Sequence, residues 1–207
     1  MKFGVHLGTR GAAGSRDGLL AIARHAEACG LDYLGFSDHI VIAREVNSPY
    51  PYTADQKWFA HDTGFCLEQL SVLSFVAAVT ERIRLLTSVM VIPYREPILA
   101  NKLITTADIL SNGRVTVGLG AGWMAEEMAL LGSPPYAARG RVAQEYVEAF
   151  KALWTEDEPR YQGEFVSFDG LYAEPKSVQR PHPPLWMGGE APAAKRRARR
   201  RLVSGDQ

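Results

Sequence analysis

Short apolar runs alternate along the chain with segments in which apolar residues recur at helical spacing. The runs that predict strands cover residues 3–8, 33–39, 83–92, 114–117 and 185–189. Helical spacing appears at residues 19–26, 67–79, 97–110, 124–131 and 141–154. Five strand–helix units in series predict an α/β fold with a parallel sheet and helices outside it. Periodicity alone does not decide between a doubly wound sheet and the larger part of an eightfold barrel.

Turn and cap residues predict where several helices begin and end. Ser15 or Asp17 is suited to cap the first helix, and Gly30 stands where a left-handed residue would end it. Pro97 fits the first turn of a later helix, which is expected to stop at residues 111–113.

Three segments depart from the strand–helix rhythm. Residues 40–64 form a long loop rich in proline and aromatic residues, which favours a lid or substrate wall over a linker. Residues 161–172 alternate in the manner of a small β-hairpin insertion. Six of residues 195–202 are cationic, so we expect one domain over residues 1–194 and a disordered basic tail over residues 195–207.

Composition indicates a soluble globular protein with a sizeable core. The 207 residues are 46% hydrophobic, and Lys+Arg 23 balance Asp+Glu 23, which argues against nucleic acid or an anionic membrane as partner. No apolar run approaches the length of a membrane span, so the cytoplasm is the expected location. Cys29 and Cys66 are expected to be small buried residues in a reducing compartment. The pair His61–Asp62 lacks companion ligands, and no metal is expected.

Three alternate glycines follow the fourth predicted strand. Gly118, Gly120 and Gly122 would let the backbone approach a flat or anionic ligand where a Cβ atom would collide. A dinucleotide fingerprint would need another glycine where Trp123 stands. The alternative to a ligand site is a tight turn packed on a neighbouring strand.

Several motifs together resemble the luciferase-like flavin and deazaflavin oxidoreductases over residues 1–194. These motifs are Ser37-Asp-His39, Leu86-Thr-Ser-Val89, Val117-Gly-Leu-Gly-Ala-Gly-Trp123, Arg139-Gly-Arg141 and Pro181-His-Pro-Pro-Leu-Trp-Met-Gly-Gly189. The resemblance implies a TIM (β/α)8-type barrel that is incomplete here, with about five units and a C-terminal truncation relative to the family. Ser-Asp-His at this place is more similar to the branch that uses coenzyme F420 than to the branch that uses FMN.

The resemblance also implies a set of site residues. Sites in such barrels gather at the carboxyl ends of the strands. His39 would manage the substrate's proton, unless it is only hydrogen-bonded under a loop. Glu126, or its neighbour Glu127, could supply a second acid, unless these carboxylates only complement the dipole at the helix start. The residues expected to bind the cofactor are Asp38, Ser88, Val89, Gly120, Ala121, Gly122, Gly188 and Gly189.

Some of these residues carry more specific expectations. Asp38 would contact the coenzyme or else orient His39, and His6 is expected to line the same mouth. The amides of Gly188 and Gly189 would offer an anion hole for a phosphate, unless these glycines only mark the end of the strand. In the family the bond corresponding to Ser88–Val89 is often a cis peptide, which we therefore expect here.

The expected function is hydride transfer between coenzyme F420 and a small organic substrate. An FMN-dependent monooxygenase and a non-catalytic flavin-binding homologue are the alternatives. The substrate and the oligomeric state stay open, a homodimer included.

Overall fold

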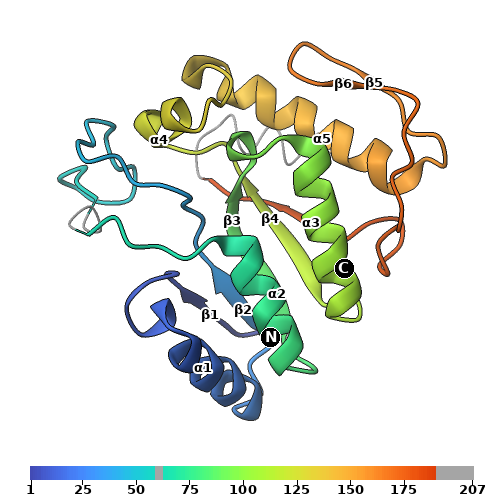
Figure 1. Ribbon diagram of the computed structural model, residues 1–207. Helices are drawn as coiled ribbons and strands as arrows, with labels where there is room; N and C mark the ends of the chain where they lie inside the picture. The colour runs from blue at the N-terminus through green and yellow to red at the C-terminus, as the bar shows by residue number, and fades with distance from the viewer. Residues whose placement is uncertain (59–62, 190–207) are drawn as a thin grey trace.

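Five parallel strands form the centre of the computed structural model, which describes residues 1–58 and 63–189. They stand side by side in the order β1-β2-β3-β4-β7 (Figure 1). Their bounds are β1 (Gly4–Leu7), β2 (Tyr33–Phe36), β3 (Arg84–Val91), β4 (Val115–Gly120) and β7 (Leu185–Met187). The β3–β4 pairing shifts register between Thr87 and Met90. The predicted order of strands and helices is therefore confirmed.

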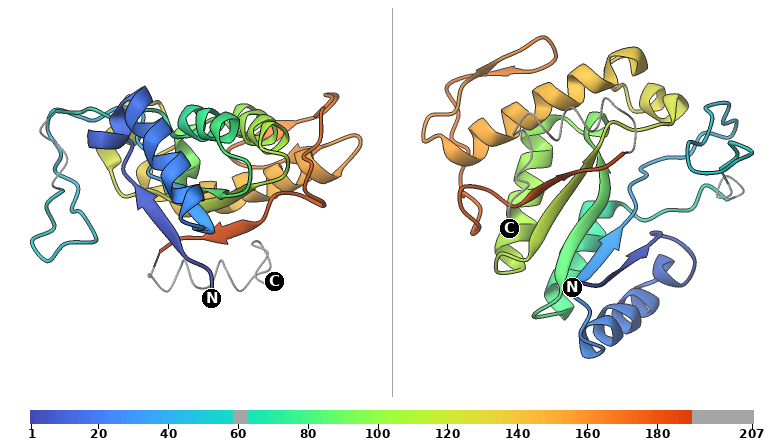
Figure 2. Two further views of the ribbon diagram at one scale, coloured as in Figure 1. Left: turned by 90° about the horizontal axis from the view of Figure 1, so that it is seen from below. Right: turned by 180° about the vertical axis from the view of Figure 1, so that it is seen from behind.

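The four long helices all lie on one face of this sheet (Figure 2). They are α1 (Arg16–Ala28), α2 (Gln69–Val79), α3 (Pro97–Leu110) and α5 (Arg139–Thr155). A doubly wound sheet would carry helices on both faces, whereas a barrel carries them only outside. Sequential strand order with helices on one side identifies the described residues as part of a (β/α)8-type barrel.

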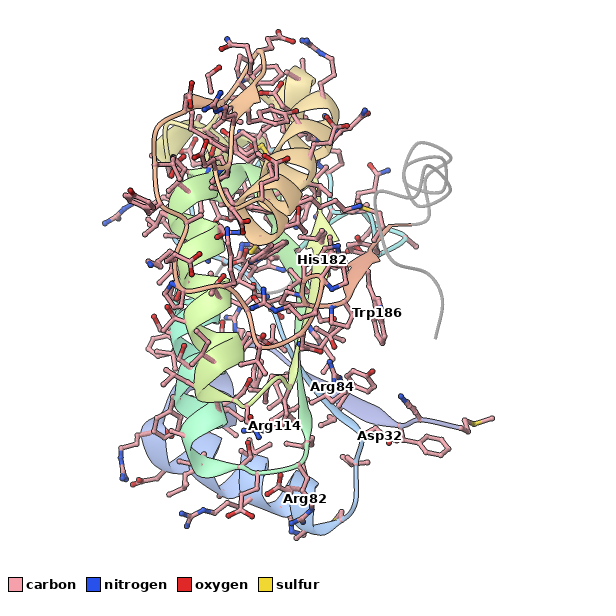
Figure 3. All side chains as sticks on the ribbon, turned by 90° about the vertical axis from the view of Figure 1, so that its right-hand side faces the viewer. Asp32, Arg82, Arg84, Arg114, His182 and Trp186 are labelled. Atoms are coloured by element: carbon pink, nitrogen blue, oxygen red, sulfur yellow. The ribbon has the colours of Figure 1, made fainter. Side chains whose placement is uncertain are left out.

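Side chains alternate between the two faces of the sheet. Leu34, Phe36, Leu85, Val117 and Leu119 are fully buried in the core beneath the helices. Their neighbours on the strands face the inner side of the barrel, where Trp186 projects away from the helices (Figure 3). Gly35 and Ser88 line that inner side together with the larger His6, Leu86 and Trp186.

The predicted helix ends are confirmed at several residues. Ser15 Oγ accepts a hydrogen bond from the Gly18 N–H at 3.2 Å and caps α1, with Asp17 in the first turn. Gly30 follows α1 with φ of +74°, as the left-handed conformation requires. Pro97 is the first residue of α3.

Short elements complete the fold. They are α4 (Ala125–Leu130), the antiparallel pair β5 (Tyr161–Gln162) and β6 (Ser167–Phe168), and the 3-10 turns η1 (Gly11–Gly14), η2 (Ile92–Tyr94) and η3 (Tyr136–Ala138). The β5–β6 pair confirms the hairpin insertion. Glu145 of α5 holds its turn by accepting hydrogen bonds from three consecutive backbone N–H groups, those of residues 164–166. The described part of the segment between β2 and α2 extends beside α4 at the carboxyl ends of the strands (Figure 1).

The expectation that both cysteines are buried was wrong for Cys29. Cys29 is exposed, because it is the residue that follows the last turn of α1 at the surface. Cys66 is half-buried in the segment before α2. The basic tail and the pair His61–Asp62 lie outside the described residues. Within the described ranges, no helix is both long and apolar enough to cross a bilayer.

Candidate active site

Three polar side chains, each following one of three consecutive strands, meet at one point. His39 follows β2, Tyr94 lies in η2 after β3, and Glu127 lies in α4 after β4. His39 Nδ1 lies 2.6 Å from Glu127 Oε2, and the Tyr94 hydroxyl donates to the same oxygen at 2.8 Å. Because the carboxyl ends of parallel strands meet at one edge, residues 88 positions apart are brought into contact.

Glu127 is completely buried, and its hydrogen bonds offset the free-energy cost of removing the carboxylate from water. Its other oxygen, Oε1, accepts from the N–H groups of Ile40 at 2.7 Å and Val41 at 3.2 Å. Burial and the negative charge of Glu127 raise the pKa of Tyr94, so the phenol stays protonated and can donate. Nδ1 of His39 is thus engaged with the carboxylate, which makes Nε2 the ring atom suited to exchange a proton with a substrate.

Asp38 does not take part in this cluster. Its side chain is fully buried and forms a two-pronged ion pair with Arg95, with both N–O distances 2.8 Å. It also accepts the Val91 N–H at 2.8 Å. Burial raises the pKa of Asp38, and the adjacent Arg95 guanidinium opposes that rise. Asp38 therefore joins the end of β2 to the end of β3, and the expectation that it contacts the coenzyme or His39 does not match this geometry.

Glu126 contacts a different part of the long loop from Glu127. Its Oε1 accepts from the backbone N–H groups of Asn47 at 2.7 Å and Ser48 at 2.9 Å. Ser48 Oγ in turn accepts the N–H of Ala125 at 3.0 Å. Glu126 thus binds the long loop, and the acid beside His39 is Glu127.

Aromatic side chains surround the His39 imidazole. Trp58 stacks at a tilt on the ring with centroids 4.7 Å apart, and Trp123 presents an edge at 6.4 Å. Tyr50 packs edge-on against Trp123 at 5.0 Å. The predicted aromatic segment therefore does form a wall above His39, which is only 14% exposed.

The expected cis peptide between Ser88 and Val89 is present. Val89 lies between two of the predicted cofactor-binding glycines. A Cβ atom added at Gly120 would be 2.6 Å from Val89 Cγ2, and one at Gly188 would be 2.5 Å from Val89 Cγ1. Glycine at both positions is therefore a packing requirement at the inner face of the barrel.

The remaining predicted glycines have different surroundings. Gly122 has φ of +81°, and a Cβ atom there would collide with Met128 and Val91, so it fits the turn into α4. The neighbouring Ala121 is partly buried against the core. The Gly188 N–H donates to Leu119 O at 2.8 Å. It is therefore part of the sheet, and its expected role in an anion hole was wrong.

A hollow of about 380 Å³ lies on the inner face next to Ser88. Its lining includes His6, Gly35, Leu86 and Trp186. His6 Nε2 is within hydrogen-bond distance of Ser88 O, at 3.1 Å, and of the Ser37 hydroxyl, at 3.2 Å. His6 thus belongs to the inner face, as expected, but it does not contact His39.

Sequence reasoning did not identify Tyr94 or Arg95 and did not select Glu127. A weak signal was available, since each follows a predicted strand at its carboxyl end. The choice between Glu126 and Glu127 depends on how α4 is rotated, which no local pattern encodes. In the ranges described, no three His, Cys, Asp or Glu side chains are placed to hold a metal ion.

The luciferase-like monooxygenase family model matches residues 1–202. The chain therefore belongs to the luciferase-like monooxygenase family.

Two relatives in sequence place the chain within that family. It is 40% identical over 168 residues to an uncharacterized protein of Mycobacterium tuberculosis, covering 81% of this chain and 59% of the relative. It is 32% identical over 135 residues to the FMNH(2)-dependent dimethylsulfone monooxygenase of Pseudomonas putida, covering 64% and 37%. The chain thus spans less than two thirds of the length of either relative.

Solved structures agree on the fold. Monooxygenase RslO1 from Streptomyces bottropensis superimposes with a TM-score of 0.70 at 25% identity, over 90% of this chain and 53% of that one. An F420-dependent secondary alcohol dehydrogenase superimposes with a TM-score of 0.73 at 20% identity, over 93% and 53%.

Proposed function

We propose that this chain carries the catalytic half-site of an F420-dependent oxidoreductase that transfers a hydride to or from a small organic substrate. The observation that carries the proposal is the His39–Glu127 contact of 2.6 Å at the rim of a glycine-lined barrel face. The Ser37-Asp-His39 motif supports the deazaflavin branch of the family.

The inner face fits a flat ring system. Gly118, Gly120 and Gly188 are each packed so closely that a Cβ atom would collide with β3. Val89 packs directly on Gly120 and Gly188, so a planar group bound here would lie against the Ser88–Val89 bond and the Val89 side chain. We assign Ser88, Val89 and Gly120 to the surface that would contact the ring, with Ala121 and Gly189 at its margin.

Each polar group at the rim has a distinct role in the proposed chemistry. A bound reduced deazaflavin would supply the hydride. His39 Nε2 would take up or deliver the substrate's proton, because Nδ1 is held by Glu127. The Glu127 carboxylate would stabilise the imidazolium, and Trp58 and Trp123 would exclude water from the ring.

A second candidate is an FMN-dependent monooxygenase. It is favoured by the 32% identity to the dimethylsulfone monooxygenase of Pseudomonas putida. Both candidates use the same inner face, so coenzyme preference separates them.

Titration of the purified chain with reduced F420 and with reduced FMN tests the proposal. We expect F420 to bind more tightly and Gly120→Ala to weaken its binding about tenfold, because the added methyl group displaces Val89, a change worth about 1–3 kcal/mol. Gly8→Ala is the matched control, since its Cβ atom would meet only the flexible Arg10 side chain at 3.4 Å.

The role of His39 needs a separate measurement of turnover. We expect His39→Ala to lower kcat by about 10²-fold or more, and Glu127→Gln to lower it less, because the imidazole remains. Binding of neither coenzyme would contradict the proposal, and tighter binding of FMN would favour the second candidate. Full turnover by His39→Ala would contradict the role given to His39, and coenzyme binding without turnover in the parent protein would favour the non-catalytic alternative.

A further inference from the structure

We infer that Glu126 is a positioning residue, which holds the aromatic wall of Tyr50 and Trp58 over His39 from the first turn of α4. The inference rests on the proposed function only in giving the chemistry to His39. It concerns a carboxylate that the proton-transfer step does not use.

The two adjacent carboxylates of α4 bind the same loop at two different places. Glu127 accepts the N–H groups at the start of the loop, those of residues 40 and 41. Glu126 accepts those of Asn47 and Ser48, at 2.7 and 2.9 Å. Ser48 Oγ adds a third contact between the loop and α4 by accepting the Ala125 N–H at 3.0 Å.

The second contact point lies directly before the aromatic segment. Tyr50 is two residues after Ser48 and packs on Trp123 at 5.0 Å, and Trp58 packs on Trp123 at 5.8 Å and on His39 at 4.7 Å. Because residues 37–68 contribute no helix or strand in their described part, the wall depends on such side-chain contacts for its position.

The state of the carboxylate is consistent with this role. Burial alone would raise the pKa of Glu126, but the Ser48 hydroxyl and the N–H groups of Asn47 and Ser48 hold it below its usual value. Within the described residues Oε2 of Glu126 is buried and has no hydrogen-bond partner. The loop therefore packs onto α4 around the charged form of Glu126.

Tryptophan accessibility tests the inference without any coenzyme. In a Trp186→Phe background the tryptophans are Trp58, Trp123 and the buried Trp154. We expect Glu126→Ala to raise the acrylamide quenching constant about twofold, because the wall separates from Trp123 and His39. Glu158→Ala, which removes an exposed carboxylate after the end of α5, is the matched control and should leave quenching unchanged.

Two more variants separate a positioning role from loss of folding. Glu126→Gln keeps the oxygen that accepts both N–H groups, so its quenching should lie close to that of the parent protein. Ser48→Ala removes the hydroxyl, and with it the contacts to Ala125 and Glu126, but keeps both backbone N–H groups that Glu126 accepts. It should raise quenching by a smaller amount, which keeps the test valid if Glu126→Ala does not fold.

Turnover supplies the second readout. Glu126→Ala should raise KM more than it lowers kcat, because His39 and Glu127 remain in place. Unchanged quenching in Glu126→Ala, or quenching in Glu126→Gln as large as in Glu126→Ala, would overturn the inference. Failure of coenzyme binding would contradict the proposed function alone.

Discussion

Arg114 shows how a single buried side chain stabilises the ends of two helices. It lies directly after the turn that ends α3, and it points back under α2 (Figure 3). Its guanidinium donates to Ser111 O at 2.7 Å and to Thr80 Oγ1, Ile83 O, Ala77 O and Thr80 O, each at 2.9 Å. The last carbonyls of a helix have no partner within that helix, so Arg114 satisfies groups that would otherwise be buried without a hydrogen bond.

Replacing Arg114 by lysine should therefore be costly although the charge is kept. Lysine has three donors on one atom and cannot reach all five acceptors, so at least one buried carbonyl loses its partner. We expect the free energy of unfolding to fall by about 2–4 kcal/mol, measured by urea denaturation. Arg82→Lys, at an exposed arginine nearby, should change it by less than about 0.5 kcal/mol, and equal effects of the two would contradict this account.

At the scale of elements, α2 is joined to β2 and β3 through a chain of charges. Glu68 caps α2 by accepting the N–H groups of Leu70 at 3.1 Å and Ser71 at 2.7 Å. It also pairs with Arg95 at 2.6 Å, and Arg95 in turn pairs with Asp38. The start of α2 and the ends of two strands are thus connected below the rim of the site.

This chain of charges predicts an acid-sensitive contribution to stability. Burial alone would raise the pKa of Glu68, but the Ser71 N–H and the Arg95 guanidinium hold it below its ordinary value of 4.5. A lowered folded-state pKa means that the carboxylate stabilises the fold above about pH 4.5, and that this contribution is lost as the pH falls through the lowered pKa.

Comparison of Glu68→Gln with the parent protein by urea denaturation checks this prediction. The difference between their free energies of unfolding should be largest at pH 6–7 and should shrink below about pH 4.5. A difference that stays constant over this range would show that the charge of Glu68 does not matter.

At the scale of the whole molecule, the sheet is covered by helices on one face only among the described residues (Figure 2). The inner face exposes Trp186, which is 43% accessible and packs on Tyr33 with ring centroids 5.3 Å apart. Exposed aromatic residues beside a hollow of this size are typical of surfaces that bind a partner or ligand.

We expect this surface to make the chain self-associate at high concentration. Trp186→Glu should weaken that association about tenfold, because a charge would have to be buried in the contact. Sedimentation velocity over a range of concentrations measures the effect. Tyr172→Glu changes an aromatic residue that is 93% exposed and lies after the hairpin, so an equal effect there would contradict a role for the inner face.

Local patterns in the sequence were sufficient for the order of the strands and helices. Alternation and helical spacing are properties of neighbouring residues, as are the Ser15 cap, the turn at Gly30 and the Pro97 helix start. The family motifs added the barrel, the Ser88–Val89 cis peptide and the position of His39 at the end of a strand. These features need no knowledge of which residues meet across the fold.

Tertiary structure alone decided which carboxylate is the partner of His39. Adjacent residues on a helix point about 100° apart, so a small rotation of α4 would exchange Glu127 for Glu126. Tertiary structure also decided the partner of Asp38. Its side chain pairs with Arg95, whereas that of the neighbouring His39 pairs with Glu127. The rotation of a helix about its axis, and the direction in which a side chain after a strand points, are set by packing between segments that are distant in the sequence. No pattern of neighbouring residues encodes that packing.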